Sequence, residues 1–105
     1  MDPADGVFRA LADPSRRAIF ERLTHGEAPV RDLTAHFNIS QPAISQHLAV
    51  LRAAHLVAER REGRLVFYRV EPKGLRPLVD WIAHYQAFWT HHLDRLQALL
   101  KDMDQ

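Results

Sequence analysis

The chain has 105 residues, enough for one small hydrophobic core but not for a catalytic cleft between two lobes. Its composition, 47% hydrophobic and 26% charged, is typical of a folded globular domain and excludes disordered and collagen-like chains. Cysteine is absent, which excludes disulfides, thiolate metal ligands and cysteine nucleophiles. A net charge of +1 does not by itself indicate a nucleic-acid partner, so the positions of the charges matter.

The sequence carries no sign of a membrane or secretory segment. No apolar run approaches the roughly 18 residues of a spanning helix. The first residues, MDPADGVF, lack the basic start and apolar stretch of a secretory signal. We therefore expect a single domain over residues 1–105 that acts in the cytoplasm.

Two Asp-Pro pairs predict the starts of the first two helices. Asp2 precedes Pro3 at the beginning of the chain, and the same pair recurs at residues 13–14. In each pair the aspartate can cap a helix, and the proline has a φ that suits the first turn. The first helix is expected to end near Ala12. Helical spacing of apolar residues extends the second helix to Thr24, and His25 and Gly26 close it.

The next stretch predicts two helices joined by a short turn. Apolar residues at spacings of three and four predict a third helix from Val30 to Phe37. Ser40 is suited to cap a fourth helix over residues 41–54, because its hydroxyl can accept a hydrogen bond from an amide of the first turn. Two helices in this order indicate a helix-turn-helix.

The fourth helix has two different faces. At about 100° per residue, its large apolar side chains fall on one side, and small or hydrogen-bonding residues on the other. Such a side suits a major groove about 12 Å wide, where Gln46 can bond bidentately to adenine. An ordinary surface helix with short polar residues would show the same pattern. The side chains predicted to contact DNA are Ser40, Gln41, Pro42, Ser45, Gln46 and Ala49.

A basic β-hairpin is predicted after this helix. Residues 56–61 and 65–70 form the two expected strands, with Glu62 and Gly63 in the tight turn between them. The predicted wing therefore covers residues 56–70. Arg60, Arg61 and Arg64 cluster at or near its tip, where they can reach phosphates or a minor groove. The alternative is that these arginines simply solvate an exposed hairpin.

A long amphipathic helix is expected over residues 77–102. About 25 residues make a helix about 37 Å long, more than a domain of this size covers with its own core. We therefore expect part of its apolar face to meet a second copy, which would space two reading helices by about one turn of DNA. The alternative is packing wholly within the monomer. The expected interface residues on this helix are Leu78, Trp81, Ile82, Tyr85, Phe88, Trp89, Leu93, Leu96 and Leu100.

Three stretches in one order carry a family resemblance over nearly the whole chain: FRALADPSRRAIFERL, VRDLTAHFNISQPAISQHLAVLRAAHLV and ERREGRLVFYRV. On them the chain resembles the ArsR-type winged-helix transcriptional regulators. The resemblance implies a mainly α fold with a small β-hairpin (α+β), in the order α-α-α-α-β-β-α. It also implies a homodimer formed through the first and last helices, which adds Phe8 to the expected interface.

The resemblance also directs attention to two metal sites that family members carry. Members that sense arsenite or soft metals carry a Cys pair where this chain has Pro29 and Arg31, and neither residue binds such a metal. A second family site uses Asp and His on the last helix, with the His two residues after the Asp, but here the residue two positions after Asp80 is Ile82. We therefore expect the metal-independent branch, without a metal or cofactor. His84, His91 and His92 leave a zinc- or nickel-responsive repressor as an alternative.

The sequence favours a DNA-binding regulator over an enzyme. It contains no nucleophile elbow, no phosphate-binding Gly loop and no paired-carboxylate setting, so we expect no catalytic residue. We expect a homodimeric repressor that binds a pseudo-palindromic promoter site on double-stranded DNA. A winged-helix module for protein contact is a further alternative, although the basic wing argues against it. The residues do not reveal the operator, the target genes or any small-molecule or protein effector. They also do not distinguish repression from activation.

Overall fold

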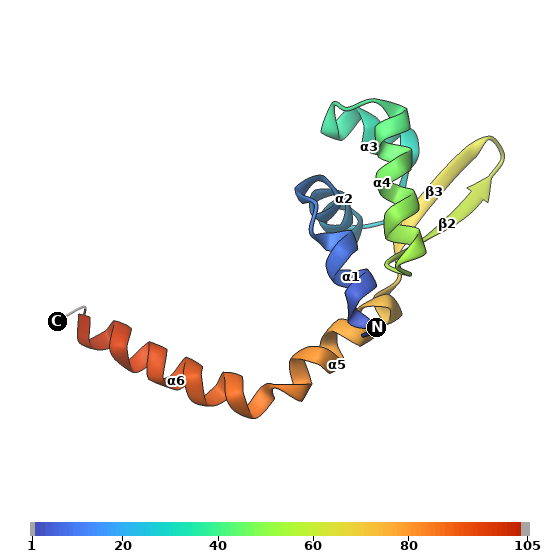
Figure 1. Cartoon of the computed structure of the whole chain (residues 1–105). Coiled ribbons are helices and arrows are strands. Elements are labelled where there is room, and N and C mark those ends of the chain that lie inside the picture. The colour runs from blue at the N-terminus through green and yellow to red at the C-terminus, as the bar shows by residue number, and fades with distance from the viewer. Residues whose placement is uncertain (1, 104–105) are drawn as a thin grey trace.

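The computed structural model describes residues 2–103. Four helices, a hairpin and a C-terminal helical segment follow one another along the chain (Figure 1). The predicted fold class, mainly helical with a small antiparallel sheet, is confirmed. The elements are α1 Ala4–Leu11, α2 Pro14–Thr24, β1 Ala28–Pro29, α3 Val30–Phe37, α4 Gln41–Ala53, β2 Val57–Glu62, β3 Leu65–Val70, the 3₁₀ helix η1 Pro72–Leu75, α5 Arg76–His84 and α6 Gln86–Met103.

Two of the three predicted helix caps are present. At the first helix the N-cap residue is Pro3, which makes no side-chain cap, although the Asp2 carboxylate accepts a hydrogen bond from the amide of Ala4 at 2.8 Å. The Asp13 carboxylate accepts hydrogen bonds from the amides of Ser15 and Arg16 at 2.7 and 3.1 Å, and so caps α2. The Ser40 hydroxyl accepts from the amide of Ala43 at 3.3 Å and caps α4. These local bonds satisfy amides that a helix start otherwise leaves without partners. The starts of α2 and α4 therefore follow from residues next to them in sequence.

The core lies beneath α4. Ile44, Leu48 and Leu51 project from its inner face and are fully buried. They pack in one cluster with Ile19 of α2 and Leu33 of α3. The predicted inward face of the helix is confirmed, and α4 is fixed with its other face outward.

The sheet has one strand more than the predicted hairpin. The strands are antiparallel in the order β1-β3-β2, and β1 pairs Ala28 with Tyr68. The hairpin turn falls at residues 63–64, one residue later than predicted, and Gly63 adopts φ +61° there. A positive φ at the first position of a two-residue turn favours glycine. Because β1 has only two residues and pairs with a strand 40 positions later, no local pattern marks it.

The prediction of one continuous C-terminal helix is wrong. The chain breaks between α5 and α6 at Tyr85, whose amide donates to the carbonyl of Ile82 at 3.1 Å in a tightened last turn. Neither Pro nor Gly lies at the break. The Tyr85 ring instead packs on Trp81, with ring centroids 5.1 Å apart. Side-chain packing at the edge of the body therefore accompanies the break.

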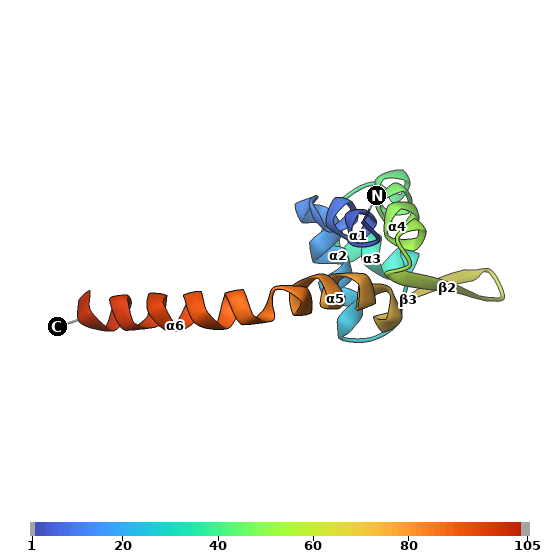
Figure 2. The same ribbon diagram turned by 60° about the horizontal axis from the view of Figure 1, so that its bottom comes forward.

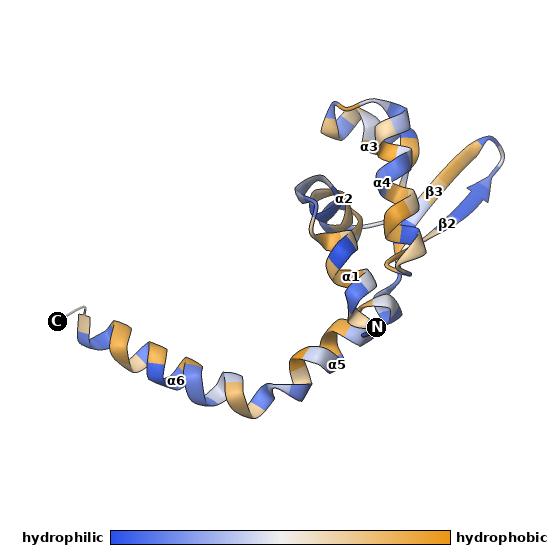
Figure 3. Ribbon diagram, viewed as in Figure 1, coloured by the Kyte–Doolittle hydropathy of each residue, from blue (hydrophilic) through white to orange (hydrophobic). Residues whose placement is uncertain are grey.

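α6 extends away from the rest of the molecule (Figure 2). The molecule measures 58 × 35 × 20 Å, and its radius of gyration is 17.8 Å. A compact chain of this length would have a radius of gyration of about 13 Å. No residue of α6 within the described part is buried, and apolar residues recur along the helix (Figure 3). Within residues 2–103, every helix is too short or too polar to cross a membrane.

Candidate nucleic-acid interface

α3 and α4 form a helix-turn-helix. Asn38 ends α3 in the left-handed conformation, with φ 53° and ψ 42°, which asparagine tolerates better than most residues. The turn then leads through Ile39 to the Ser40 cap of α4. Ile39 packs against the core, so the turn is held from inside. The position of α4 relative to α3 thus depends on one backbone conformation, one cap and one apolar contact.

The outer face of α4 is open and carries the residues predicted to contact DNA. Gln41, Pro42, Ser45, Gln46 and Ala49 are all exposed, as is the capping residue before them. None of these side chains is charged, so the face offers hydrogen-bonding groups and small apolar surfaces to a base edge.

The exposed face of α4 also includes Val50, which is 38% exposed and was not among the predicted contacts. It lies four residues after Gln46, about 40° away around the helix. Helical spacing would therefore have identified it.

The hairpin formed by β2 and β3 is the wing, and its two faces differ. Successive residues of a strand project to opposite faces. The carboxylate of Glu59 on β2 pairs with Arg52 on α4 at 3.0 Å, so the face that carries Glu59 is turned toward α4. Arg61, two residues on, shares that face. Arg60 projects to the opposite face.

Arg60 is held within the protein. Its guanidinium donates to both oxygens of Glu27 and to Glu62 at 2.7 Å, and it lies over the ring of Phe67 at 4.6 Å. The hydrogen bond from Arg60 lowers the pKa of Glu27, and the two carboxylates raise the already high pKa of Arg60. The charge of Arg60 is therefore balanced by its neighbours. Glu27, 33 residues away, was not identified from the sequence, because no local spacing links it to the wing.

The remaining arginines of the hairpin region divide into two groups. Arg52 pairs with Glu59, and Arg69 pairs with Glu71 at 3.3 Å. Arg61 and Arg64, both exposed, form no ion pair with any residue of the described range 2–103. The unbalanced positive charge of the wing is thus concentrated at its tip.

A long apolar surface lies on the other side of the molecule, along α5 and α6. Phe8 of α1 is 41% exposed and makes an edge contact with Trp81 of α5, with ring centroids 5.2 Å apart. Leu78 is partly buried against the core. The other predicted interface residues lie exposed along the two helices: Ile82, Tyr85, Phe88, Trp89, Leu93, Leu96 and Leu100.

The histidines of the last helices do not converge with acidic residues. In the part of the chain that the structure describes, no group of three or more His, Asp or Glu side chains is arranged to hold a metal ion. The carboxylate of Asp80 is paired with Arg76 at 3.0 Å. The rings of His91 and His92 contact each other with centroids 5.3 Å apart.

Comparison with known proteins reveals similar sequences and a similar fold. The family model described as "Bacterial regulatory protein, arsR family" matches residues 13–59. The HTH-type transcriptional regulator Rv2034 of Mycobacterium tuberculosis is 44% identical over 96 residues, covering 91% of this chain and 87% of that protein. The transcriptional repressor SdpR of Bacillus subtilis is 35% identical over 81 residues, covering 77% of this chain and 90% of that protein. A crystal structure of an ArsR family transcriptional regulator aligns with a TM-score of 0.75 and 31% identity, covering 84% of this chain and 91% of that chain.

Proposed function

Because this chain belongs to the ArsR family and is a DNA-binding transcriptional regulator rather than an enzyme, we propose that it acts as a homodimeric repressor that reads a pseudo-palindromic promoter site. The observation that carries this proposal is the outward face of α4, uncharged and hydrogen-bonding, beside a wing whose tip is cationic. Repression follows from occupation of the promoter, and a relative is named a transcriptional repressor. Because the proposed target is promoter DNA, the proposed location is the cytoplasm.

In this proposal, α4 reads bases in the major groove. Gln46 bonds bidentately to adenine, while Gln41 and Ser45 bond to neighbouring base edges. Pro42 and Ala49 make apolar contact with thymine methyl groups. Ser40 contributes mainly through its cap, which fixes the end of the helix that enters the groove.

The wing holds the DNA backbone in this proposal. Arg61 and Arg64 are the contacts that their exposure and lack of ion pairs favour most. Arg60 was predicted as a third contact, but binding phosphate would require it to exchange two carboxylate partners for one phosphate. We therefore assign Arg60 chiefly to bracing the wing against Glu27.

The dimer in this proposal forms through α1, α5 and α6. An apolar face along α5 and α6 that is open to water is unfavourable, and burial yields about 25 cal/mol per Å² of apolar surface. A symmetric partner would cover this face and the exposed edge of Phe8. Two copies of α4 would then approach DNA on one side, as two half-sites about one helical turn apart require.

Selection of bound sequences from random DNA at fixed salt tests the proposal. We expect a pseudo-palindrome whose half-sites are about 10 base pairs apart. Gln46→Ala should relax the preference at one position of each half-site, with a loss of about 1 to 3 kcal/mol there. Glu21→Ala, an exposed change on α2, is the control and should leave the selected sequence unchanged. Two results would contradict the assignment. The wild-type protein could select no defined sequence, or Gln46→Ala could select the same sequence as the wild type.

A further inference from the structure

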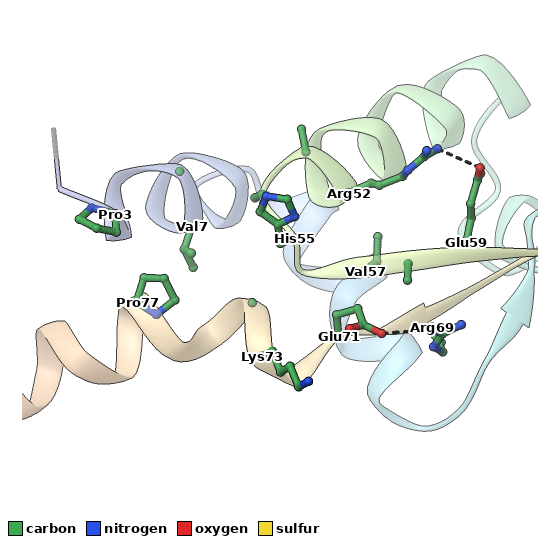
Figure 4. Close-up of a pocket in the computed structure, with 15 residues that line it drawn as sticks. Pro3, Val7, Arg52, His55, Val57, Glu59, Arg69, Glu71, Lys73 and Pro77 are labelled. Carbon is green, nitrogen blue, oxygen red and sulfur yellow. Dashed lines mark ion pairs between the residues drawn. The ribbon is translucent and has the colours of Figure 1, made fainter.

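A groove lies where the end of α4, the base of the wing, α1 and the η1–α5 segment meet (Figure 4). Its volume is about 1020 Å³. Small-molecule sites occupy about 300 to 1,000 Å³, so the groove has room for a metabolite. It is separate from the outer face of α4 and from the wing tip, because none of their predicted contact residues lines it.

One side of the groove is apolar. Pro3, which precedes α1, and Val7 of α1 line it, together with Val57 from β2 and Pro77 from α5. In Figure 4 the Val7 side chain points from α1 toward the segment that carries Pro77. Pro3 and Pro77 expose this apolar side to a ligand, whereas Val7 and Val57 lie just beneath it and are each only 2% exposed.

The other side of the groove carries charges that do not cancel. Two arginines line it, and each is already matched: Arg52 with Glu59 at 3.0 Å and Arg69 with Glu71 at 3.3 Å. Lys73 also lines the groove, is exposed, and forms no ion pair with any of residues 2–103. One positive charge is therefore left over. A ligand with a single negative charge would balance it.

The floor of the groove is preformed by close backbone contacts. The Glu71 amide donates to the carbonyl of Leu56 at 2.9 Å. A Cβ placed on Gly74 would lie 1.8 Å from the carbonyl oxygen of His55, so only glycine permits this approach. His55 itself holds the left-handed conformation, with φ 62°. Because these contacts order the floor, a ligand would lose little free energy in organising it.

We propose that this groove binds a small amphipathic carboxylate. The hydrocarbon part lies against Pro3 and Pro77, above the buried Val7 and Val57, and the carboxylate lies near Lys73. Aromatic and medium-chain acids have this chemistry. Their amides have the same shape without the charge.

A ligand in the groove would contact the ends of both elements that are proposed to face DNA, α4 and the wing. His55 directly follows α4, and Val57 begins the first strand of the wing. A ligand that binds the free and DNA-bound forms with different affinity changes the DNA affinity by the same factor. This step rests on the proposed function, whereas binding in the groove does not.

Titration of the protein without DNA tests the site. Methyl NMR signals of Val7 and Val57 are followed with octanoate and phenylacetate, each compared with its amide. We expect saturable shifts with the acids and weaker binding of the amides. Lys73→Gln should weaken binding of the acids about two- to fivefold, as for an exposed ion pair, and Lys73→Arg should retain it.

A blocking variant separates groove binding from unspecific binding. Gly6 lines the groove within α1, and a Cβ placed there meets no atom within 4 Å. Gly6→Leu should therefore fold, because a side chain other than glycine favours the helix. Its side chain should narrow the groove beside Val7 and weaken the ligand-dependent shifts. Gly6→Ala is the matched control and should retain binding.

Three results would overturn the site. The first two are no saturable shift with either acid at millimolar concentration, and equal responses to acid and amide. Signals of Val7 and Val57 that change with protein concentration but not with ligand would also overturn it, since a second copy would then cover the groove.

DNA affinity is measured last, with and without acid, in wild type and Gly6→Leu. A change in wild type alone supports the coupling. Saturable shifts with unchanged DNA affinity overturn the coupling, and failure of wild type to bind DNA at all counts against the proposed function, not the groove.

Discussion

The body of the molecule, which comprises α1 to β3, buries many of its large apolar residues, whereas the C-terminal helices α5 and α6 leave most of theirs exposed. Every fully buried apolar side chain lies in the body, between Ala4 and Tyr68. The C-terminal helices α5 and α6 contain no buried residue. Among residues 2–103, the large exposed apolar residues other than Phe8 and Val50 lie on these helices or at Tyr85 between them. The body thus has a hydrophobic core of its own within one chain. The C-terminal helices resemble half of an interface, whose stability should depend on protein concentration.

The largest difference should appear when one leucine is truncated in each region. Leu48→Ala on α4 removes a fully buried side chain and should lower the free energy of unfolding by about 2 to 5 kcal/mol. Leu99→Ala on α6, where the side chain is 58% exposed, is the control. Urea denaturation at low protein concentration, where monomers dominate, should show little change for the control. Equal losses for the two variants would mean that α6 packs on the body in solution.

A charge on the exposed face should separate the two copies without unfolding either. Leu93→Lys places an ammonium on a position that is 51% exposed in the monomer and central in the proposed interface. Burial of the exposed half of each leucine contributes about 0.8 to 1.5 kcal/mol, so its loss from both copies should raise the dimer dissociation constant at least tenfold. Sedimentation equilibrium measures this constant, and circular dichroism checks the helix content. A wild-type protein that is monomeric at micromolar concentration would refute the dimer.

The wing allows a second comparison, between arginines that are bound internally and those that are not. Arg61→Ala and Arg64→Ala should each reduce the slope of log affinity against log salt by about two for the dimer, because each removes one phosphate contact from each of two protomers. Arg60→Ala is the matched change on the same hairpin and should leave that slope nearly unchanged, since its partners are Glu27 and Glu62. A larger change in slope for Arg60→Ala than for the others would reverse the assignment.

The smallest effect concerns the cap of α2. The hydrogen bond from the amide of Arg16 lowers the pKa of Asp13 below its usual value of 3.8, so the folded state favours the ionised carboxylate. This contribution is present above the unfolded pKa and is lost as the pH falls through the folded pKa. Asp13→Asn keeps a capping oxygen that does not titrate. Its melting temperature should fall less steeply below about pH 4 than that of wild type, as measured by calorimetry. Parallel pH profiles would show that the cap does not titrate with folding.

Much of the fold was predictable because its signals are local. A cap and the amides that it accepts from are two or three residues apart, so Asp13 and Ser40 mark their helices in any context. The inward face of α4 follows from helical spacing alone, and Leu48 is buried as expected. The base contacts proposed for Gln46 and its neighbours stay predictions, although the structure leaves these side chains exposed as such contacts require.

The features that were missed depend on contacts between distant segments. The strand β1 exists through its pairing with β3, and the internal binding of Arg60 depends on Glu27, 33 residues away. The break at Tyr85 lacks Pro and Gly and accompanies the packing of its ring on Trp81. Rules based on the spacing of nearby residues cannot identify partners that are this far apart in the sequence.

The sequence by itself determined the helix starts, the two faces of α4 and the arginine-rich hairpin, because each of these depends on neighbours within a turn or a strand. Only the tertiary structure decided which arginines keep a free charge, where the last helix breaks, and that a groove joins α1 to the bases of α4 and the wing. The physical reason is that ion pairing, burial and cavity shape are set by residues far apart in the chain, and their distances exist only once the chain is folded.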